Sequence, residues 1–197
     1  MFVKKKIILA SRSPRRQILL RQIGLEFVVQ ESGVDEDFEH IQSPLDHVKI
    51  LSHRKAVEVG KNIGNGFVIG ADTIVELDGN ILGKPTDEKD AINMLHTLSG
   101  RTHKVFTGFT ILDRPSNAAL TDYAVTDVTF RRLTNDEIEE YVRSGSPMDK
   151  AGAYGIQDDY GAVFVEKIDG CFYNVVGFPL AKFYLAMQQF QESLGVM

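Results

Sequence analysis

The sequence is poor in cysteine and has no long apolar run. Cys171 is the only cysteine among 197 residues, so an intrachain disulfide and a multi-cysteine zinc site are both excluded. The apolar run behind the N-terminal lysines covers only residues 7–10, which is too short for the h-region of a signal peptide. No stretch approaches the length of a membrane span. We therefore expect a cytoplasmic protein without a membrane partner.

The chain also lacks an excess of positive charge. It has 22 Lys and Arg against 27 Asp and Glu, a formal net charge of −5. A sequence-independent grip on DNA or RNA normally needs a basic patch, so we expect no nucleic-acid partner. Any anionic ligand must be bound by a local cluster of cations. The Walker loop and the GxGxxG, HExxH and GxSxG signatures are absent as well.

The composition and the order of segments are those of a globular α/β protein. Hydrophobic residues make up 43% of the chain and charged residues 25%, enough to build one sizeable core or two small lobes that share a cleft. Helix-like and strand-like segments interleave, with hairpins among them, which predicts a mixed sheet with flanking helices. Predicted helices cover residues 14–24, 44–62, 87–100, 135–145 and a last segment from about 179. Predicted strands cover residues 6–10, 26–32, 66–77, 102–113, 119–133, 162–168 and a short segment after Gly170.

Helix caps mark several of these boundaries. Ser13 and Ser43 each precede a proline at a predicted first helical position, and Thr86 and Thr134 are further predicted caps. The hairpin after residue 77 is predicted to turn at residues 78–80.

The first candidate site is the helix start at Ser13. A helix N-terminus is a ready anion site, and Arg15 and Arg16 could add bidentate contacts to phosphate. Cations are disfavoured at this end of a helix unless a ligand or a carboxylate neutralises them. Two solvated arginines on a surface helix are the alternative.

Lys55 is the second candidate. At 100° per residue it falls in the middle of the apolar stripe of its helix, whereas Lys49 and Lys61 lie off it. An inward lysine needs a partner, because an unpaired buried ammonium group is costly. The alternative is a lysine that snorkels to the rim of the stripe. The stripe consists of Leu45, Val48, Leu51, Val59 and Ile63.

Asp72 is the third candidate. It follows the apolar run 67–71, where a buried strand is predicted to end, and ligands often meet α/β sheets at such ends. A carboxylate there could bind magnesium or accept a proton from water, whereas a structural turn cap is the alternative. Thr73 is adjacent, and Lys84 returns from the hairpin. Glu36, in the acidic run 35–37, could add a metal ligand, or the run could be a solvated loop.

Gly152 and Gly155 would allow the backbone to approach a ligand closely; a simple turn is the alternative explanation for them. Gln157 can donate and accept hydrogen bonds, which suits recognition of the edge of a base. His103 has no partner at metal spacing and is predicted to be structural.

Six short segments are each a modest indicator of a protein family, but their occurrence in this order is highly specific. They are SRSPRR, SHRKA, GADTIVELDGNILGKP, LSGRTHKVFTG, DKAGAYGIQ and VVGFP. From about residue 7 to residue 185, this set resembles the Maf family of nucleotide pyrophosphatases. The resemblance implies one domain over residues 1–197, with an elongated mixed sheet, flanking helices and two lobes around a cleft. It also implies a relation to inosine-triphosphate pyrophosphatases and a homodimer.

The resemblance further implies hydrolysis of nucleoside triphosphates between the α- and β-phosphates, with Mg²⁺ or Mn²⁺. Asp72 matches the general base and would bind the metal, with Glu36 as a second ligand. The helix start at Ser13 and the side chains of Arg15, Arg16, Lys55 and Lys84 would face phosphate.

Three positions match the branch of the family that acts on dTTP and UTP: Arg15, Thr73 and Gln157. The chain departs from the family in GIQDDYG, where Asp158 and Asp159 add negative charge, and in VVGFP, a harmless change of volume. The alternative function is a nucleotide-binding regulator of septation without turnover. Retention of Asp72 and of the full set of cations argues against it.

Overall fold

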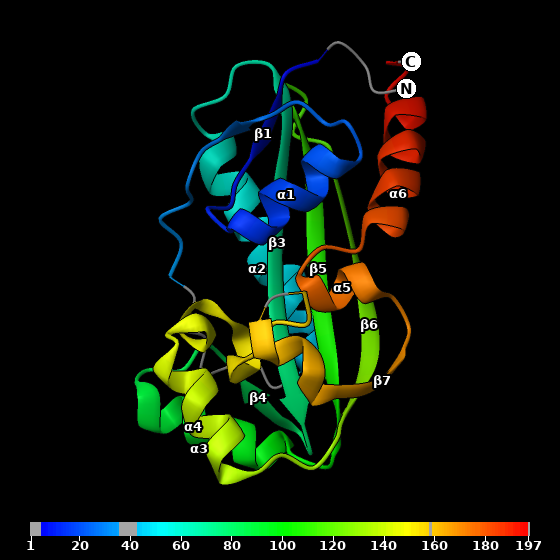
Figure 1. The fold of residues 1–197 in the computed structure, drawn as a ribbon. Helices are drawn as coiled ribbons and strands as arrows, with labels where there is room; N and C mark the ends of the chain where they lie inside the picture. The colour runs from blue at the N-terminus through cyan, green and yellow to red at the C-terminus, as the bar shows by residue number, and fades with distance from the viewer. Residues whose placement is uncertain (1–4, 36–42, 158, 197) are drawn as a thin grey trace. The chain divides into compact units, whose positions relative to one another are not determined.

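The computed structural model describes residues 5–35, 43–157 and 159–196, and Figure 1 follows their elements along the chain. It confirms a mixed α/β fold with helices flanking a sheet. The helices are α1 (Pro14–Gln22), α2 (Pro44–Gly60), α3 (Glu88–Leu98), α4 (Asn135–Arg143), α5 (Phe172–Val176) and α6 (Leu180–Ser193), with 3-10 helices η1 (Ser146–Asp149), η2 (Ala151–Ala153) and η3 (Asp159–Phe164). The strands are β1 (Ile7–Leu9), β2 (Val28–Val29), β3 (Gly66–Leu77), β4 (Asn80–Leu82), β5 (Thr102–Arg114), β6 (Ala119–Phe130) and β7 (Val165–Asp169).

The described strands form one sheet in the order β2-β1-β3-β5-β6-β7, with β4 paired to β3. β1 runs parallel to both β2 and β3, and its Leu9 lies beside Ile69. β4 and β7 pair antiparallel with their neighbours. Leu77 pairs with Asn80, so the β3–β4 turn is Asp78-Gly79, both with positive φ. This is the backbone that a two-residue hairpin requires.

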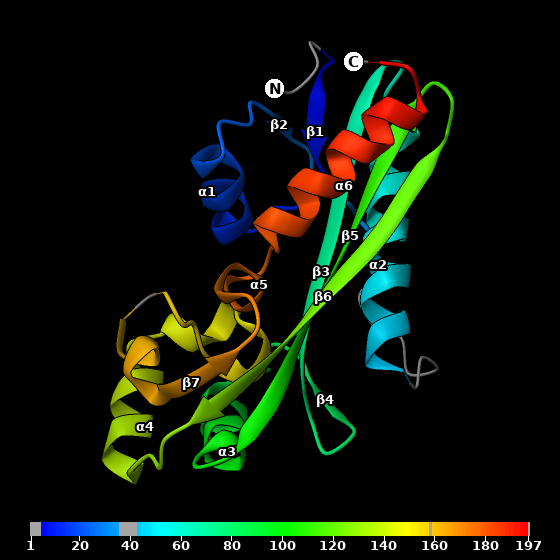
Figure 2. The same cartoon turned by 90° about the vertical axis from the view of Figure 1, so that its right-hand side faces the viewer.

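The chain separates into two compact units. The first unit comprises Met1–Asp72, Thr107–Ala124 and Gly177–Met197. In it, α2 covers one face of the strands, and α1 and α6 lie on the opposite face (Figure 2). A buried apolar cluster joins α2 to the sheet, as expected from the stripe of this helix. The cluster consists of Ile8, Ala10, Ala56, Val59, Val68 and Leu112.

Two glycines allow the backbone of α2 to lie directly on the strands. A Cβ at Gly70 of β3 would lie 2.1 Å from the carbonyl oxygen of Ser52, and one at Gly108 of β5 would lie 2.4 Å from that of Val48. The Ser52 hydroxyl also hydrogen-bonds that of Thr110 at 3.1 Å. The atoms that a Cβ at either glycine would meet first are backbone atoms of α2. The lack of a side chain at Gly70 and Gly108 therefore allows α2 to lie this close to the sheet.

The opposite face of the first unit has an aromatic core. The ring of Phe67 lies 6.1 Å from that of Phe190, and Phe109 lies 5.7 Å from Phe183. Side chains alternate between the two faces of a strand, so Phe67 faces α6 whereas Val68 faces α2. Both faces of the strand are therefore buried at this level.

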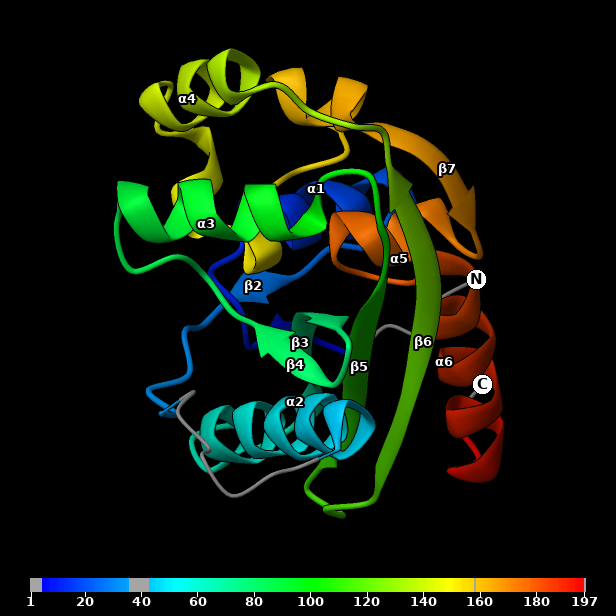
Figure 3. The same ribbon diagram turned by 90° about the horizontal axis from the view of Figure 1, so that it is seen from below.

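The second unit comprises Thr73–Phe106 and Val125–Val176. Here α3 and α4 lie side by side (Figure 3). Its core contains His103, Phe130 and Tyr154, whose rings meet edge to face. The Nε2 atom of His103 hydrogen-bonds the Tyr154 hydroxyl at 2.8 Å, and burial lowers the pKa of His103 to about 4. His103 is structural in this geometry.

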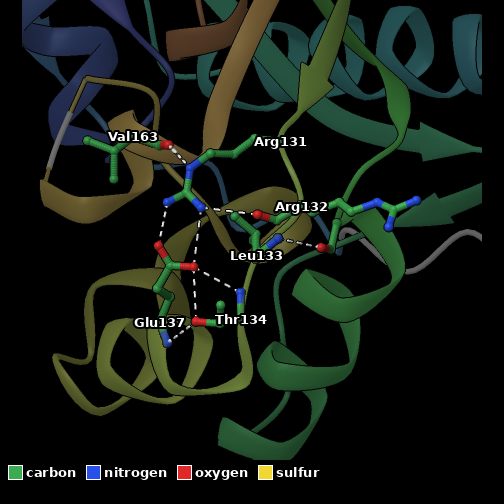
Figure 4. A network of polar contacts seen from close by, with 7 residues as sticks. Arg131, Arg132, Leu133, Thr134, Glu137 and Val163 are labelled. Atoms are coloured by element: carbon green, nitrogen blue, oxygen red, sulfur yellow. Dashed lines mark hydrogen bonds and ion pairs between the residues drawn. The ribbon is translucent and has the colours of Figure 1, made fainter.

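A polar network fixes the start of α4 (Figure 4). Thr134 and Glu137 form a reciprocal capping box, so the predicted cap is confirmed. Arg131 donates to both carboxylate oxygens of Glu137, at 2.6 and 3.2 Å, and to the carbonyl of Val163 at 2.7 Å. The hydrogen bond from Arg131, aided by that from the Thr134 backbone, lowers the pKa of Glu137 to about 2.

The structure corrects some sequence-based boundaries. Asp87, not Thr86, caps α3, because its carboxylate accepts from the Asp90 N–H. The segment predicted as a strand after Gly170 is the helix α5, and residues 159–164 precede β7 as η3. In α5 the buried Asn174 donates to the Val105 carbonyl at 3.0 Å. A short apolar run does not distinguish a strand from a buried helix.

Candidate active site

The start of α1 has the features of an anion site. The Ser13 hydroxyl accepts from the Arg16 N–H, Pro14 occupies the first turn, and that turn contains no acidic residue. The positive end of the helix is therefore not neutralised by a carboxylate of its own first turn.

Arg16 is fixed across this helix start. Its Nη1 atom donates to the hydroxyl of Ser11 at 3.0 Å, and its Nε atom donates to the carbonyl of Gly177 at 3.1 Å. Ser11 is buried, and Arg15 and Arg16 are half-buried. The side chain of Arg16 is therefore not freely solvated, which was the alternative for this residue.

Lys55 and Asp72 form a buried pair. The ammonium group of Lys55 on α2 donates to Oδ1 of Asp72 on β3 at 2.7 Å, and the two residues are only 5% and 7% exposed. Lys55 therefore does not snorkel to the surface; the partner that an inward lysine requires is Asp72. Burial also strengthens this interaction compared with an exposed pair.

Asp72 does not stand at the end of its strand, as the sequence suggested, but inside β3, which continues to Leu77. It is therefore not a turn cap. The neighbouring parallel strand β1 does end, at Leu9 beside Ile69, and Ser11 follows. Ser11 and Asp72 thus follow the paired segments of two adjacent strands at the same level. Asp72 lies between the residues that pair with β1 and those that pair with β4.

His47 is a member of this cluster that sequence reasoning missed. Its Nε2 atom lies 3.9 Å from Oδ2 of Asp72, beyond hydrogen-bonding distance but within that of an ion pair when the ring is protonated. The available signal was its place two turns before Lys55 on the same helix.

The other candidates belong to the second unit. Thr73 follows Asp72 on β3 and is half-buried, and Lys84 is exposed after β4. The carbonyl of Gly83 accepts from the N–H of Gly152 at 3.0 Å, which ties the segment of Lys84 to the start of the DKAGAYGIQ loop. Gln157 is half-buried at the end of this loop. Glu36 and Asp158 lie outside the described residues.

Comparison with known proteins identifies the family. Residues 6–190 match the family described as Maf-like protein. The chain belongs to the Maf family.

Two curated relatives illustrate the similarity. A protein of Desulforamulus reducens named dTTP/UTP pyrophosphatase is 47% identical over 94% of this chain and 97% of its own length. A protein of the same name from Clostridium botulinum is 50% identical over 90% of this chain and 93% of its own length. Among solved structures, the Staphylococcus aureus Ham1 protein aligns with 64% of this chain and 72% of its own, at 14% identity and a TM-score of 0.40.

The Maf match includes every candidate residue named above, in both units. In the described part of the chain, no helix is long and apolar enough to cross a membrane, and no group of three or more His, Cys, Asp or Glu residues could bind a metal ion. A magnesium ion that arrives with a triphosphate needs only one or two protein carboxylates, since phosphate oxygens and waters complete its shell. Asp72, a buried carboxylate, fits that requirement.

Lys150 is the second residue that sequence reasoning missed. It precedes the small residues of the DKAGAYGIQ loop and is only 7% exposed. Its ammonium group contacts the carbonyl of Ser146 at 2.5 Å and Oδ1 of Asp149 at 2.8 Å. No periodic stripe marked it, because it lies between two 3-10 helices rather than on a long helix.

Proposed function

We propose that this protein hydrolyses dTTP and UTP to the nucleoside monophosphates and pyrophosphate. The observation that carries this proposal is the buried Lys55–Asp72 pair. Asp72 lies on β3, which pairs with β1, and β1 precedes the start of α1, whose first turn has no acidic residue. The names of the curated relatives support the choice of substrates. One functional domain over residues 1–197 is proposed because the Maf match extends over residues 6–190.

Asp72 is the proposed general base. Lys55 donates to Oδ1. The carboxylate would orient a water molecule and accept its proton as the water attacks the α-phosphorus. The fixed ammonium group also holds the carboxylate in one orientation. Orientation of the attacking water is a large part of catalysis in reactions of this kind.

The phosphate groups are proposed to bind at the start of α1 and to nearby cations. Free N–H groups of a helix start and arginine side chains bind phosphate oxygens without moving, and they offset the charge that develops on the leaving pyrophosphate. Arg16 is already oriented by Ser11 and Gly177. The full proposed set is Ser13, Arg15, Arg16, Lys55 and Lys84.

Base recognition is proposed for Arg15, Thr73 and Gln157. A carboxamide offers both a donor and an acceptor, and a hydroxyl can act as either, which matches the edge of a pyrimidine base. Asp72 is the proposed metal ligand, with Glu36 as a second. A bound Mg²⁺ or Mn²⁺ ion would supply positive charge to the phosphate oxygens. A homodimer is proposed from family likeness, and sedimentation velocity tests it.

Asp72→Asn tests the proposed function. Loss of a general base should lower kcat for dTTP by about 10²–10⁴-fold. The matched control is Asp113→Asn, because Asp113 is a buried aspartate of the same unit that pairs with Lys5. Pyrophosphate release is measured for a panel of canonical and modified nucleoside triphosphates, with and without Mg²⁺ or Mn²⁺.

The control variant should keep turnover even where it loses stability. Wild-type turnover by Asp72→Asn would contradict the assignment of the base. Nucleotide binding by the wild-type protein without any pyrophosphate release would instead favour the regulator without turnover.

A further inference from the structure

His47 lies beside the proposed general base but has no role in the proposed chemistry. Its Nε2 atom is 3.9 Å from Oδ2 of Asp72, whereas the ammonium group of Lys55 donates to the other carboxylate oxygen, Oδ1, at 2.7 Å. His47 and Lys55 both belong to α2, so one helix presents a nitrogen atom to each oxygen of the same carboxylate. All three residues are part of the first unit.

The distance between His47 and Asp72 suits a water molecule that binds both. At 3.9 Å, Nε2 and Oδ2 are too far apart for a direct hydrogen bond. Two polar atoms at this separation can both hydrogen-bond one water that lies about 2.8 Å from each of them. The two side chains are 12% and 10% exposed, so solvent reaches part of each.

A histidine ring can bind such a water in either of its forms. Without a proton, Nε2 accepts the second hydrogen of the water; with a proton, it donates to one of the lone pairs of the water. The first hydrogen of the water is directed at Asp72 in both arrangements. A lone pair of the water oxygen is left for attack on phosphorus in both as well.

A second hydrogen bond would orient the water for the proposed reaction. In that reaction the water oxygen forms a bond to the α-phosphorus and its proton passes to Asp72. The bond from the α-phosphorus to the oxygen that bridges to the β-phosphorus breaks, and pyrophosphate leaves with the electron pair of that bond. A water bound by Asp72 alone still rotates about its one hydrogen bond, whereas a reactant held in the right orientation reacts faster.

We propose that His47 and Asp72 together bind the attacking water, with His47 orienting it and Asp72 accepting its proton. This inference rests on the proposed function, in which Asp72 is the general base. It makes His47 a second catalytic residue, which contacts the reacting water and not the base or the phosphates of the nucleotide. His47 should therefore affect kcat rather than the choice of nucleotide.

The test compares His47→Leu with His53→Leu. His53 is exposed on the same helix, so its replacement removes the same ring away from Asp72. In His47→Leu, kcat for dTTP should fall about three- to tenfold, the net worth of one hydrogen bond. KM should change little, and kcat for UTP should fall by the same factor as kcat for dTTP. His53→Leu should keep wild-type kcat and KM.

Two polar variants keep the test informative if His47→Leu folds poorly. The amide of His47→Gln reaches the position of the Nε2 atom and can bind the same water, so it should restore most of kcat. The shorter amide of His47→Asn ends nearer the position of Nδ1 and should leave kcat low. In an Asp72→Asn background, His47→Leu should cause little further loss, because the water no longer has its base.

Each failure has a distinct signature. Wild-type kcat in folded His47→Leu, or a raised KM with kcat unchanged, would overturn the inference. Equal losses in the Leu, Gln and Asn variants would show that the ring matters for packing alone, which overturns it too. So would a loss in the Asp72→Asn background as large as the loss in wild-type protein. If wild-type protein releases no pyrophosphate, or if Asp72→Asn keeps wild-type turnover, the proposed function itself fails, whatever the His47 variants do.

Discussion

Gly70→Ala should separate Lys55 from Asp72 without touching either residue. The added methyl group would lie 2.1 Å from the Ser52 carbonyl oxygen and 2.8 Å from the Ala56 nitrogen, both backbone atoms of α2. Ordinary contacts begin near 3.4 Å, so this part of α2 must retreat by about 1.3 Å. The 2.7 Å contact of Lys55 with Asp72 would then lengthen to about 4 Å, beyond a hydrogen bond.

The stability of the variant and its turnover of dTTP both report this displacement. Forcing a methyl group into a packed interface costs about 1–3 kcal/mol of unfolding free energy, which urea titration detects. Loss of the ion pair that orients Asp72 should lower kcat for dTTP by at least about tenfold, a change worth about 1.4 kcal/mol of transition-state stabilisation. KM should change less, because the start of α1 is not part of this interface.

Gly60→Ala is the matched control. It adds the same methyl group to α2 itself rather than to β3, but the nearest atom is Cδ2 of Leu112 at 2.6 Å, the flexible end of a side chain. It should lose stability and keep kcat. Equal kcat values for Gly70→Ala and wild-type protein, in folded samples, would refute the claim that the close approach of α2 sets the Lys55–Asp72 contact.

Two pH effects on stability follow from the second unit, and both are measured by urea titration across pH. The pKa of Glu137 is lowered to about 2 by Arg131, so its contribution is present above pH 4.5 and is lost as the pH falls toward 2. Glu137→Gln should remove this pH dependence, whereas the exposed Glu139→Gln should retain it. Burial lowers the pKa of His103 from 6.5 to about 4, so the unfolded chain binds a proton in that window that the folded chain does not. Stability should therefore fall by up to about 3 kcal/mol from pH 6.5 to 4, and a His103→Phe variant that keeps this fall would contradict the assignment.

Local signals predicted helix boundaries well where the cap is a short-range interaction. Ser13 and Ser43 accept from backbone N–H groups three residues ahead, which depends only on nearby residues. Thr86 failed because Asp87, next to it, caps the helix instead. The α5 helix could not be predicted locally, since its Asn174 binds the Val105 carbonyl and the Thr126 hydroxyl, both more than 40 residues away in sequence.

The sequence predicted a residue of the candidate site where that residue interrupts a periodic pattern of apolar residues. Lys55 interrupts an apolar stripe, so helix geometry predicted an inward lysine but left snorkelling to the rim as the alternative. The identity of its partner depends on how closely α2 approaches β3, which Gly70 permits but no periodicity reveals. The burial of Lys150 could not be predicted from a periodic pattern, because this residue lies between two 3-10 helices.

The neighbouring residues Asp72 and Thr73 of β3 are proposed to determine two different properties. Asp72 is proposed to act with Lys55 on the reaction itself, whereas Thr73 is proposed to act with Arg15 and Gln157 on the choice of base. Consecutive strand residues face opposite sides of the sheet, so Asp72 faces α2 and Thr73 faces away from it. A substitution at Thr73 that keeps the branched Cβ can therefore alter selectivity while the Lys55–Asp72 contact is retained, because the changed atoms lie on the other face of β3.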